Sequence, residues 1–322
     1  MVNLGFWEKL KRPILVLAPL ANVTDVAFRS VIAKYGKPDV LWTEFVSADG
    51  LFMGGREKLL RDLEFGSGEH PIVAQFFTSK PEMMKKAAAL AAELGFDGID
   101  INMGCPDRSV EKQGAGAALI KNPKLAREII RAAKAGAGNL PVCIKTRTGY
   151  NKDELDTWLG ELLAEEPAVI TIHARTRKEM SKVPARWSDV KRAVEMRDKL
   201  GSKTLIFGNG DVVDLDDARK KAKETGADGI MLGRAIFGNP WLFSKDNHVP
   251  TTEERLNVLV EHAKLFEKKL GDIKSFAIMK KHFKAYVSGW DGAKELRVKL
   301  MEANSSGEVT AIVKEYLSVV EV

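Results

Sequence analysis

The chain has 322 residues, of which 45% are hydrophobic and 29% are charged, and its formal net charge is +6. It is long enough for a sizeable core, and no apolar run approaches the length of a membrane span. The short apolar run near the N-terminus resembles a first strand more than a signal peptide. Two cysteines do not indicate a disulfide framework, and the five histidines show no metal-ligand spacing. We therefore expect a cytoplasmic protein without a metal ion, whose mildly basic balance permits a polyanionic partner without requiring one.

An alternation of strands and helices runs through the first two thirds of the chain. The candidate strands are residues 14–20, 40–45, 71–77, 98–103, 141–147, 168–174, 203–210 and 229–235. Most of them are nearly continuous apolar runs, which are typical of parallel strands buried on both faces. Eight such units predict a (β/α)8 TIM barrel. A doubly wound open sheet is the alternative, although the turn after the first strand lacks the GxGxxG pattern of that fold.

The pattern changes after the polar linker SKDNHVPTTEE, beyond which the sequence is all-helical. We expect a barrel domain over residues 1–245 and a small helical domain over residues 251–322. Residues 264–284 contain seven lysines and, as acidic residues, only Glu267 and Asp272. From composition alone, this run is best interpreted as a solvated helix face. The functional alternative is a patch that binds nucleic-acid phosphates.

Polar side chains stand at the C-terminal ends of the candidate strands, the end at which barrels carry their active sites. These residues are Glu44, Gln75, Asn102, Lys145, Arg147, His173, Arg175, Asn209 and Arg234. One of them would be ordinary in a core, but a series on successive strands favours a shared site. Taken alone, Lys145 either extends outward or points into that site, and His173 is either a core histidine or a site residue.

Two glycine motifs follow the last two strands, GNGD at residues 208–211 and GRA at residues 233–235. Barrels commonly bind phosphate with these two loops. Glycine lets backbone N–H groups approach phosphate oxygens closely, and Arg234 adds a planar, permanently charged group. The glycines could instead serve only tight turns, but two motifs in adjacent loops favour phosphate binding.

Cys105 lies between Gly104 and Pro106, in the loop after the fourth strand. A thiol with an ordinary pKa is mostly protonated at neutral pH, so it can donate a proton as well as attack as a nucleophile. A small buried hydrophobe is the alternative, which suits Cys143 inside PVCIK better. The glycine-rich residues 113–120 extend this loop, and we expect it to be mobile and to close on substrate.

Seven segments occur in order between about residues 14 and 243. They are APLANVTDVAFR, INMGCP, GAGAALI, IKTRTGY, IHARTR, GNGD and GIMLGRAIFGNPWLF. Together they resemble the tRNA-dihydrouridine synthases, and the helical tail is similar to that family's C-terminal RNA-binding domain. The resemblance implies FMN-dependent reduction of uridine to 5,6-dihydrouridine in tRNA, with NADPH as the electron donor.

The resemblance also implies a role for individual residues. The flavin would lie against Pro19, Leu20 and Ala21, and its ring would contact Gln75 and Lys145. Its ribityl phosphate side would be held by His173, Asn209, Gly210, Asp211, Gly233 and Arg234. The substrate base or its phosphate would face Asn102 and Arg177. Hydride would pass from flavin N5 to uracil C6, and the Cys105 thiol would protonate C5.

Residues 178–187 depart from the family pattern, which leaves the modified position, and whether the RNA is a tRNA, open. One alternative is an FMN-dependent oxidoreductase of a free pyrimidine or another small enone, against which the helical tail argues. Another is a non-enzymatic RNA-binding protein or chaperone, against which Cys105, Lys145 and the phosphate loops argue. We find no nicotinamide fingerprint, so NADPH rests on the resemblance alone, and we expect a monomer.

Overall fold

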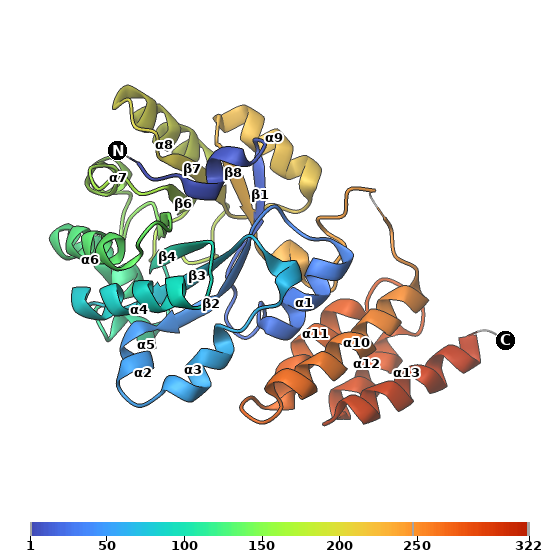
Figure 1. The fold of residues 1–322 in the computed structure, drawn as a ribbon. Helices are drawn as coiled ribbons and strands as arrows, with labels where there is room; N and C mark the ends of the chain where they lie inside the picture. The colour runs from blue at the N-terminus through green and yellow to red at the C-terminus, as the bar shows by residue number, and fades with distance from the viewer. Residues whose placement is uncertain (1, 247, 321–322) are drawn as a thin grey trace.

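The computed structural model describes residues 2–246 and 248–320 and contains an eight-stranded parallel sheet curled into a barrel (Figure 1). The strands are β1 (Ile14–Leu17), β2 (Leu41–Ser47), β3 (Ile72–Phe77), β4 (Gly98–Met103), β5 (Val142–Arg147), β6 (Val169–His173), β7 (Leu205–Asn209) and β8 (Gly229–Leu232). Strands β2 to β8 pair in chain order, and β1 pairs with β8. An isolated parallel bridge between Val16 and Val40 lies at the remaining seam. The predicted (β/α)8 barrel is confirmed, and the open doubly wound sheet is wrong.

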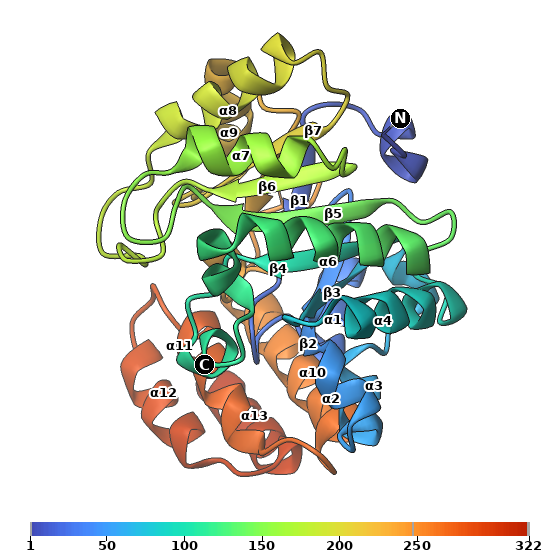
Figure 2. The ribbon, with the colours of Figure 1, turned by 90° about the vertical axis from the view of Figure 1, so that its left-hand side faces the viewer.

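Helices follow the strands and cover the outside of the barrel (Figures 1 and 2). They are α1 (Val26–Tyr35), α2 (Ala48–Phe52), α3 (Arg56–Asp62), α4 (Pro81–Glu93), α5 (Arg108–Glu111), α6 (Pro123–Gly136), α7 (Leu155–Leu163), α8 (Trp187–Lys199) and α9 (Leu215–Thr225). Capping residues fix where they begin, as at α1, where the Asp25 carboxylate accepts the Ala27 and Phe28 N–H groups at 3.0 Å. Helix α9 ends at Gly226, whose φ of 72° lies in the left-handed region that favours glycine.

The end of the barrel where the strands begin is filled with aromatic side chains. The short helix η1 (Gly5–Lys9) places Trp7 there, buried, with ring centroids 5.8 Å from Trp42 and 5.5 Å from Phe207. An added Cβ at Gly98, the first residue of β4, would lie 3.4 Å from Phe6, so this helix lies close to the strand starts. The opposite end, where the strands finish, is therefore the end left for a site.

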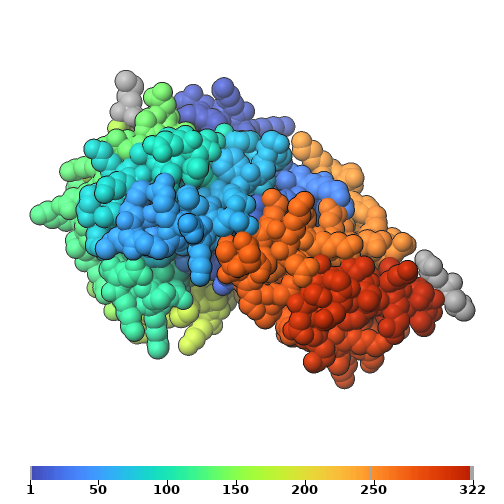
Figure 3. All heavy atoms as spheres, turned by 60° about the horizontal axis from the view of Figure 1, so that its bottom comes forward, coloured from blue at the N-terminus to red at the C-terminus, as the bar shows by residue number. Residues whose placement is uncertain are grey.

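The tail after the linker is all-helical, as predicted, with α10 (Thr252–Leu270), α11 (Met279–Tyr286), α12 (Ala293–Glu302) and α13 (Ser306–Val320). It forms a lobe on one side of the barrel (Figure 3). Helix α10 packs beside α1, where the Phe28 ring stacks on His262 at a centroid distance of 4.8 Å. The tail and the outer barrel share one continuous apolar core. The division into domains 1–245 and 251–322 stays a prediction.

No helix within residues 2–246 and 248–320 combines the length and the apolar character needed to cross a membrane.

Candidate functional site

The C-terminal ends of the strands surround a cavity of about 690 Å³. The predicted site residues that line it are Pro19, Leu20, Ala21, Gln75, Asn102, Cys105, Lys145, His173, Asn209, Gly210, Asp211, Gly233 and Arg234. Two further strand-end residues, Arg147 and Arg175, also line it. Residues from every part of the barrel sequence therefore meet at one place, and Lys145 and His173 point into a shared site rather than outward.

A chain of side-chain amides fixes the backbone around Cys105. The Asn102 Oδ1 accepts the N–H of Cys105 at 2.9 Å and that of Gly104 at 3.2 Å, and its Nδ2 donates to Gln75 Oε1 at 3.2 Å. Gln75 Nε2 in turn donates to Asp100 Oδ2. Burial raises the pKa of Asp100 to about 7. The loop that presents the thiol is thus anchored through β4 and β3 to the barrel interior.

The Cys105 thiol keeps its proton at neutral pH. Burial raises its pKa above the ordinary value, and the positive charges of Lys145 and Arg147 only partly oppose that effect. A protonated thiol in a cavity is a proton donor, whereas a metal ligand or a cysteine nucleophile is used as the thiolate. The environment of Cys105 therefore suits general-acid chemistry.

Lys145 is half-buried by its surface exposure and forms no ion pair with a carboxylate in the described part of the chain, although the charge of the buried Asp100 acts on it. Its Nζ donates to Asn209 Oδ1 at 3.2 Å, and Asn209 Nδ2 donates to the Met231 carbonyl at 2.7 Å. Burial and then the charge of Arg147 lower the pKa of Lys145 to about 8. The lysine remains largely cationic at neutral pH, and its charge is available to an anionic or electron-rich ligand in the cavity.

His173 is neutral at physiological pH. Burial, reinforced by the charges of Arg147 and Lys145, holds its pKa well below the usual value. Its Nε2 lies 3.1 Å from Arg175 Nη1. Because a guanidinium can only donate, this contact assigns Nε2 as the acceptor and leaves the proton on Nδ1.

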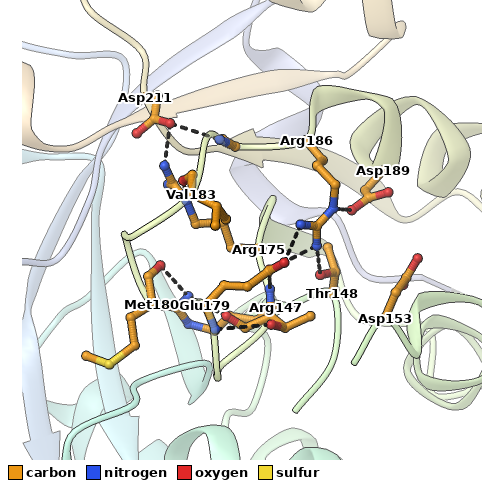
Figure 4. A network of polar contacts seen from close by, with 12 residues as sticks. Arg147, Thr148, Asp153, Arg175, Glu179, Met180, Val183, Arg186, Asp189 and Asp211 are labelled. Carbon is orange, nitrogen blue, oxygen red and sulfur yellow. Dashed lines mark hydrogen bonds and ion pairs between the residues drawn. The ribbon is translucent and has the colours of Figure 1, made fainter. Parts of the chain in front are cut away.

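Asp211 holds two arginines at the rim of the cavity. Its Oδ2 pairs with Arg175 (Figure 4) and accepts the Ala185 N–H at 2.9 Å. Its Oδ1 pairs with Arg234 at 2.7 Å. The neighbouring Gly210 has a φ of 128°, which disfavours any side chain there. One carboxylate between two guanidinium groups leaves a net positive charge at this rim.

Two buried arginines fasten the loop between β6 and α8 from the inside (Figure 4). Arg147 donates to the carbonyls of Thr176 at 3.1 Å and Met180 at 3.2 Å, and Arg175 Nε donates to the Val183 carbonyl at 2.6 Å. Arg147 Nε also donates to the Gly104 carbonyl at 2.7 Å. It therefore links the Cys105 loop to residues 178–187, the segment that departs from the family pattern. The sequence marked Arg147 as a strand-end residue but gave no sign of this bridge.

Two residues expected at the site lie outside the cavity lining. Arg177 pairs with Glu111 on α5, with its Nε at 2.9 and 3.0 Å from the carboxylate oxygens, and its guanidinium lies 5.3 Å from the Tyr150 ring centroid. Its expected contact with substrate stays a prediction. Glu44 faces the tail instead of the cavity, because the register of β2 against β3 shifts between Trp42 and Phe45. This bulge turns Phe45 toward the cavity in place of Glu44.

Within the residues that the structure describes, no group of three or more His, Cys, Asp or Glu side chains is arranged to hold a metal ion.

The family model for dihydrouridine synthase matches residues 16–320. The chain belongs to this family. A probable tRNA-dihydrouridine synthase of Staphylococcus aureus strain Mu50 is 41% identical over 315 residues, which cover 97% of this chain and 95% of that protein. Probable tRNA-dihydrouridine synthase 2 of Bacillus subtilis strain 168 is also 41% identical, over 97% of this chain and 96% of its own length. The resemblance seen in the sequence is confirmed, and this dihydrouridine synthase is an oxidoreductase.

Solved structures with this fold are much more distant. Histamine dehydrogenase from Rhizobium sp. 4-9 matches with a TM-score of 0.57 at 14% identity, over 78% of this chain and 48% of that one. A 2-naphthoyl-CoA reductase matches with a TM-score of 0.55 at 13% identity, over 72% of this chain and 49% of that one. The dihydrouridine synthase thus spans about half the length of these proteins, and the likeness concerns the fold alone.

Proposed function

We propose that this dihydrouridine synthase reduces uridine to 5,6-dihydrouridine in tRNA, with FMN as resident cofactor and NADPH as electron donor. The observation that carries the proposal is one cavity that joins a protonated thiol, Cys105, to the cation of Lys145. The names of the relatives at 41% identity support tRNA as the substrate.

The charge of the cavity suits a cofactor that carries a phosphate. Its lining holds four cationic side chains, Lys145, Arg147, Arg175 and Arg234, and one carboxylate, Asp211. An added Cβ at Gly233 would meet only Ala18, at 3.8 Å, so this loop has the open space that a phosphate needs. Phosphate binding at the loops after strands seven and eight is common in TIM barrels.

The residues that would hold FMN fall into three groups. Pro19, Leu20 and Ala21 would lie against the flavin, and Gln75 and Lys145 would contact its ring. The phosphate side would be held by His173, Asn209, Gly210, Gly233 and Arg234. Asp211 would act on that side indirectly, because its carboxylate repels phosphate while it orients Arg175 and Arg234.

When bound, FMN supplies the hydride that saturates uracil C6, drawn from NADPH. Cys105 would then deliver its proton to C5, and the thiolate left behind would be reprotonated from water. Lys145 would hold positive charge at the buried end of the cavity, and Asn102 would present the Cys105 loop and face the base. The uridine must leave its stack to reach a cavity enclosed by strand ends.

We propose that the tail contacts the RNA backbone and that the protein acts as a monomer. Among the lysines of residues 264–284, Lys274 is ion-paired with the barrel. The exposed lysines of this segment are Lys264, Lys268, Lys281 and Lys284. The exposed side chains can replace counterions along tRNA phosphates. Arg177 would join this contact only if RNA displaces Glu111.

The test is anaerobic. We would reduce the protein with NADPH and follow the visible flavin band on adding unmodified tRNA or free uracil. Return of the band with tRNA alone supports the proposal, return with uracil alone favours the small-pyrimidine reductase, and absence of any flavin band refutes both. Cys105→Ala should bind flavin yet lose most turnover, while Cys143→Ala, which alters a buried thiol inside the barrel, should keep its turnover. Near-normal turnover of Cys105→Ala would exclude the thiol as proton donor.

A further inference from the structure

Lys274 reaches from the tail into the barrel. It lies between α10 and the short helix η5 (Phe276–Ile278), and its Nζ is 2.9 Å from Glu44 Oε2 on β2 and 2.6 Å from Asp62 Oδ1 on α3. The side chains of Lys274 and Glu44 are 13% and 7% exposed. Burial opposes the charge of Lys274, but the two carboxylates outweigh it and raise the pKa of the lysine. Lys274 therefore keeps its charge at neutral pH, and its contact with Glu44 is largely shielded from solvent.

The other carboxylate oxygen of Glu44 holds the loop after β1. Its Oε1 accepts the backbone N–H of Asn22, whose φ of 53° lies in the left-handed region. Two residues earlier, the Leu20 N–H donates to Thr24 Oγ1 at 2.9 Å. Residues 19–21, directly before Asn22, line the cavity. One carboxylate thus contacts a cation of the tail and the turn that shapes one wall of the site.

Lys274 is in ion-pair contact with Glu44, while the charge of Lys281 acts on this carboxylate at longer range. Asp25 is close enough that burial first, and the charge of Glu44 second, raise its pKa to about 6. Without Lys274, the Glu44 carboxylate would lie near Asp25 and Asp62 with no cation in contact, and repulsion would turn it toward water. This movement weakens the hydrogen bond from the Asn22 N–H, because a withdrawn carboxylate is the poorer acceptor.

We propose that Glu44 is a positioning residue through which the docked tail sets the conformation of cavity-lining residues 19–21. The left-handed region costs energy for a residue with a Cβ, so Asn22 would leave it once the hydrogen bond to Glu44 is lost. This step rests on the proposed function, in which the tail holds RNA and the barrel holds flavin. The two ligands then act on opposite sides of the Lys274–Glu44 ion pair. Binding of RNA at the tail therefore changes the affinity for flavin at the barrel, and binding of flavin changes the affinity for RNA.

Amide hydrogen exchange at Asn22 in the flavin-free protein tests the coupling directly. Lys274→Met and Glu44→Ala should speed this exchange by about 10-fold or more, as expected for a lost hydrogen bond to a charged group. Asp62→Asn should leave it unchanged, because Lys274 keeps Glu44. Lys294→Met, at an exposed tail position on α12, is the matched control and should also match the wild type.

Two more variants separate the proposed coupling from a general loss of folding. Glu44→Gln leaves Lys274 paired with Asp62 and creates no unpaired buried carboxylate at position 44, and it should still speed Asn22 exchange by about 3-fold or more. Lys274→Arg keeps the cation and should restore near wild-type exchange. Wild-type exchange at Asn22 in both Lys274→Met and Glu44→Gln, with lowered thermal stability alone, would overturn the inference and leave a purely structural ion pair.

The dissociation constant for FMN, measured by flavin fluorescence, links the coupling to the site. Lys274→Met and Glu44→Ala should weaken FMN binding in parallel with the faster exchange, and Asp62→Asn and Lys294→Met should not. Faster exchange with unchanged FMN affinity would refute a role for this turn in the cofactor site. A wild-type protein that binds no FMN would refute the proposed function, whereas the exchange data would still decide whether Glu44 couples tail and turn.

Discussion

Two buried histidines should make the tail sensitive to acid. His262 on α10 and His282 on α11 are fully buried, with ring centroids 4.6 Å apart, and both pack on Phe28 of α1. Neither ring nitrogen of either side chain has a hydrogen-bond partner within the structure. Burial lowers the pKa of His282 to about 3 and holds that of His262 well below the usual value.

The sign and size of the effect follow from linkage. The folded protein keeps both histidines neutral, while the unfolded chain protonates them below pH of about 6.5, so stability falls as the pH falls. At pH 5 the unfolded state gains about 2 kcal/mol per histidine relative to pH 7.5, because the folded pKa values lie lower still. The pair should therefore cost about 4 kcal/mol of unfolding free energy over this range.

Urea unfolding at pH 7.5 and pH 5 checks this expectation. The double variant His262→Phe/His282→Phe keeps two aromatic rings on Phe28 and removes both titrations, while His70, His173 and His248 remain as in the wild type. The wild type should lose about 4 kcal/mol more than the variant between the two pH values. An equal loss in both proteins would show that the histidines are already hydrated or charged in the folded state.

Two further predictions concern the site and the tail. Arg234→Ala should weaken FMN binding about 10- to 100-fold in a fluorescence titration, as expected for a lost charge-assisted contact, and unchanged affinity would remove Arg234 from the phosphate side. The affinity for unmodified tRNA, measured by filter binding, should fall steeply with added salt, and Lys264→Met/Lys268→Met should reduce that slope. A salt response that is flat, or equal in the double variant, would remove these lysines from the interface.

The strands were predictable because a parallel strand buried on both faces is an apolar run, and all eight lie within two residues of their expected starts. The residues at which the strands end were harder to predict. The first strand was expected to continue to residue 20 but ends at Leu17, since Pro19 has no N–H for the ladder and begins the turn that lines the cavity. The last strand ends at Leu232 instead of residue 235, and Arg234 opens the short helix η4 (Arg234–Ile236).

The direction in which the Glu44 side chain points could not be predicted from the sequence, for a physical reason. Side chains alternate along a strand, so Trp42 inside the barrel would place Glu44 inside as well. The bulge between Trp42 and Phe45 breaks this alternation, and nothing in the residue types of LWTEF marks it. The pairing of Arg177 with Glu111 was hidden for another reason, since the two residues are 66 positions apart and meet only through the fold.

The cavity sets two demands on Cys105 that its cations alone would not meet. Phosphate binding calls for positive charge, yet Lys145 and Arg147 each favour the thiolate, which cannot donate a proton. Burial of the thiol outweighs them and keeps the proton in place. A phosphate bound in this cavity would add a negative charge near the thiol, which favours its protonated form further. Lys145, which would contact the flavin ring, can thus stay cationic in the same cavity in which Cys105 keeps the proton it would donate.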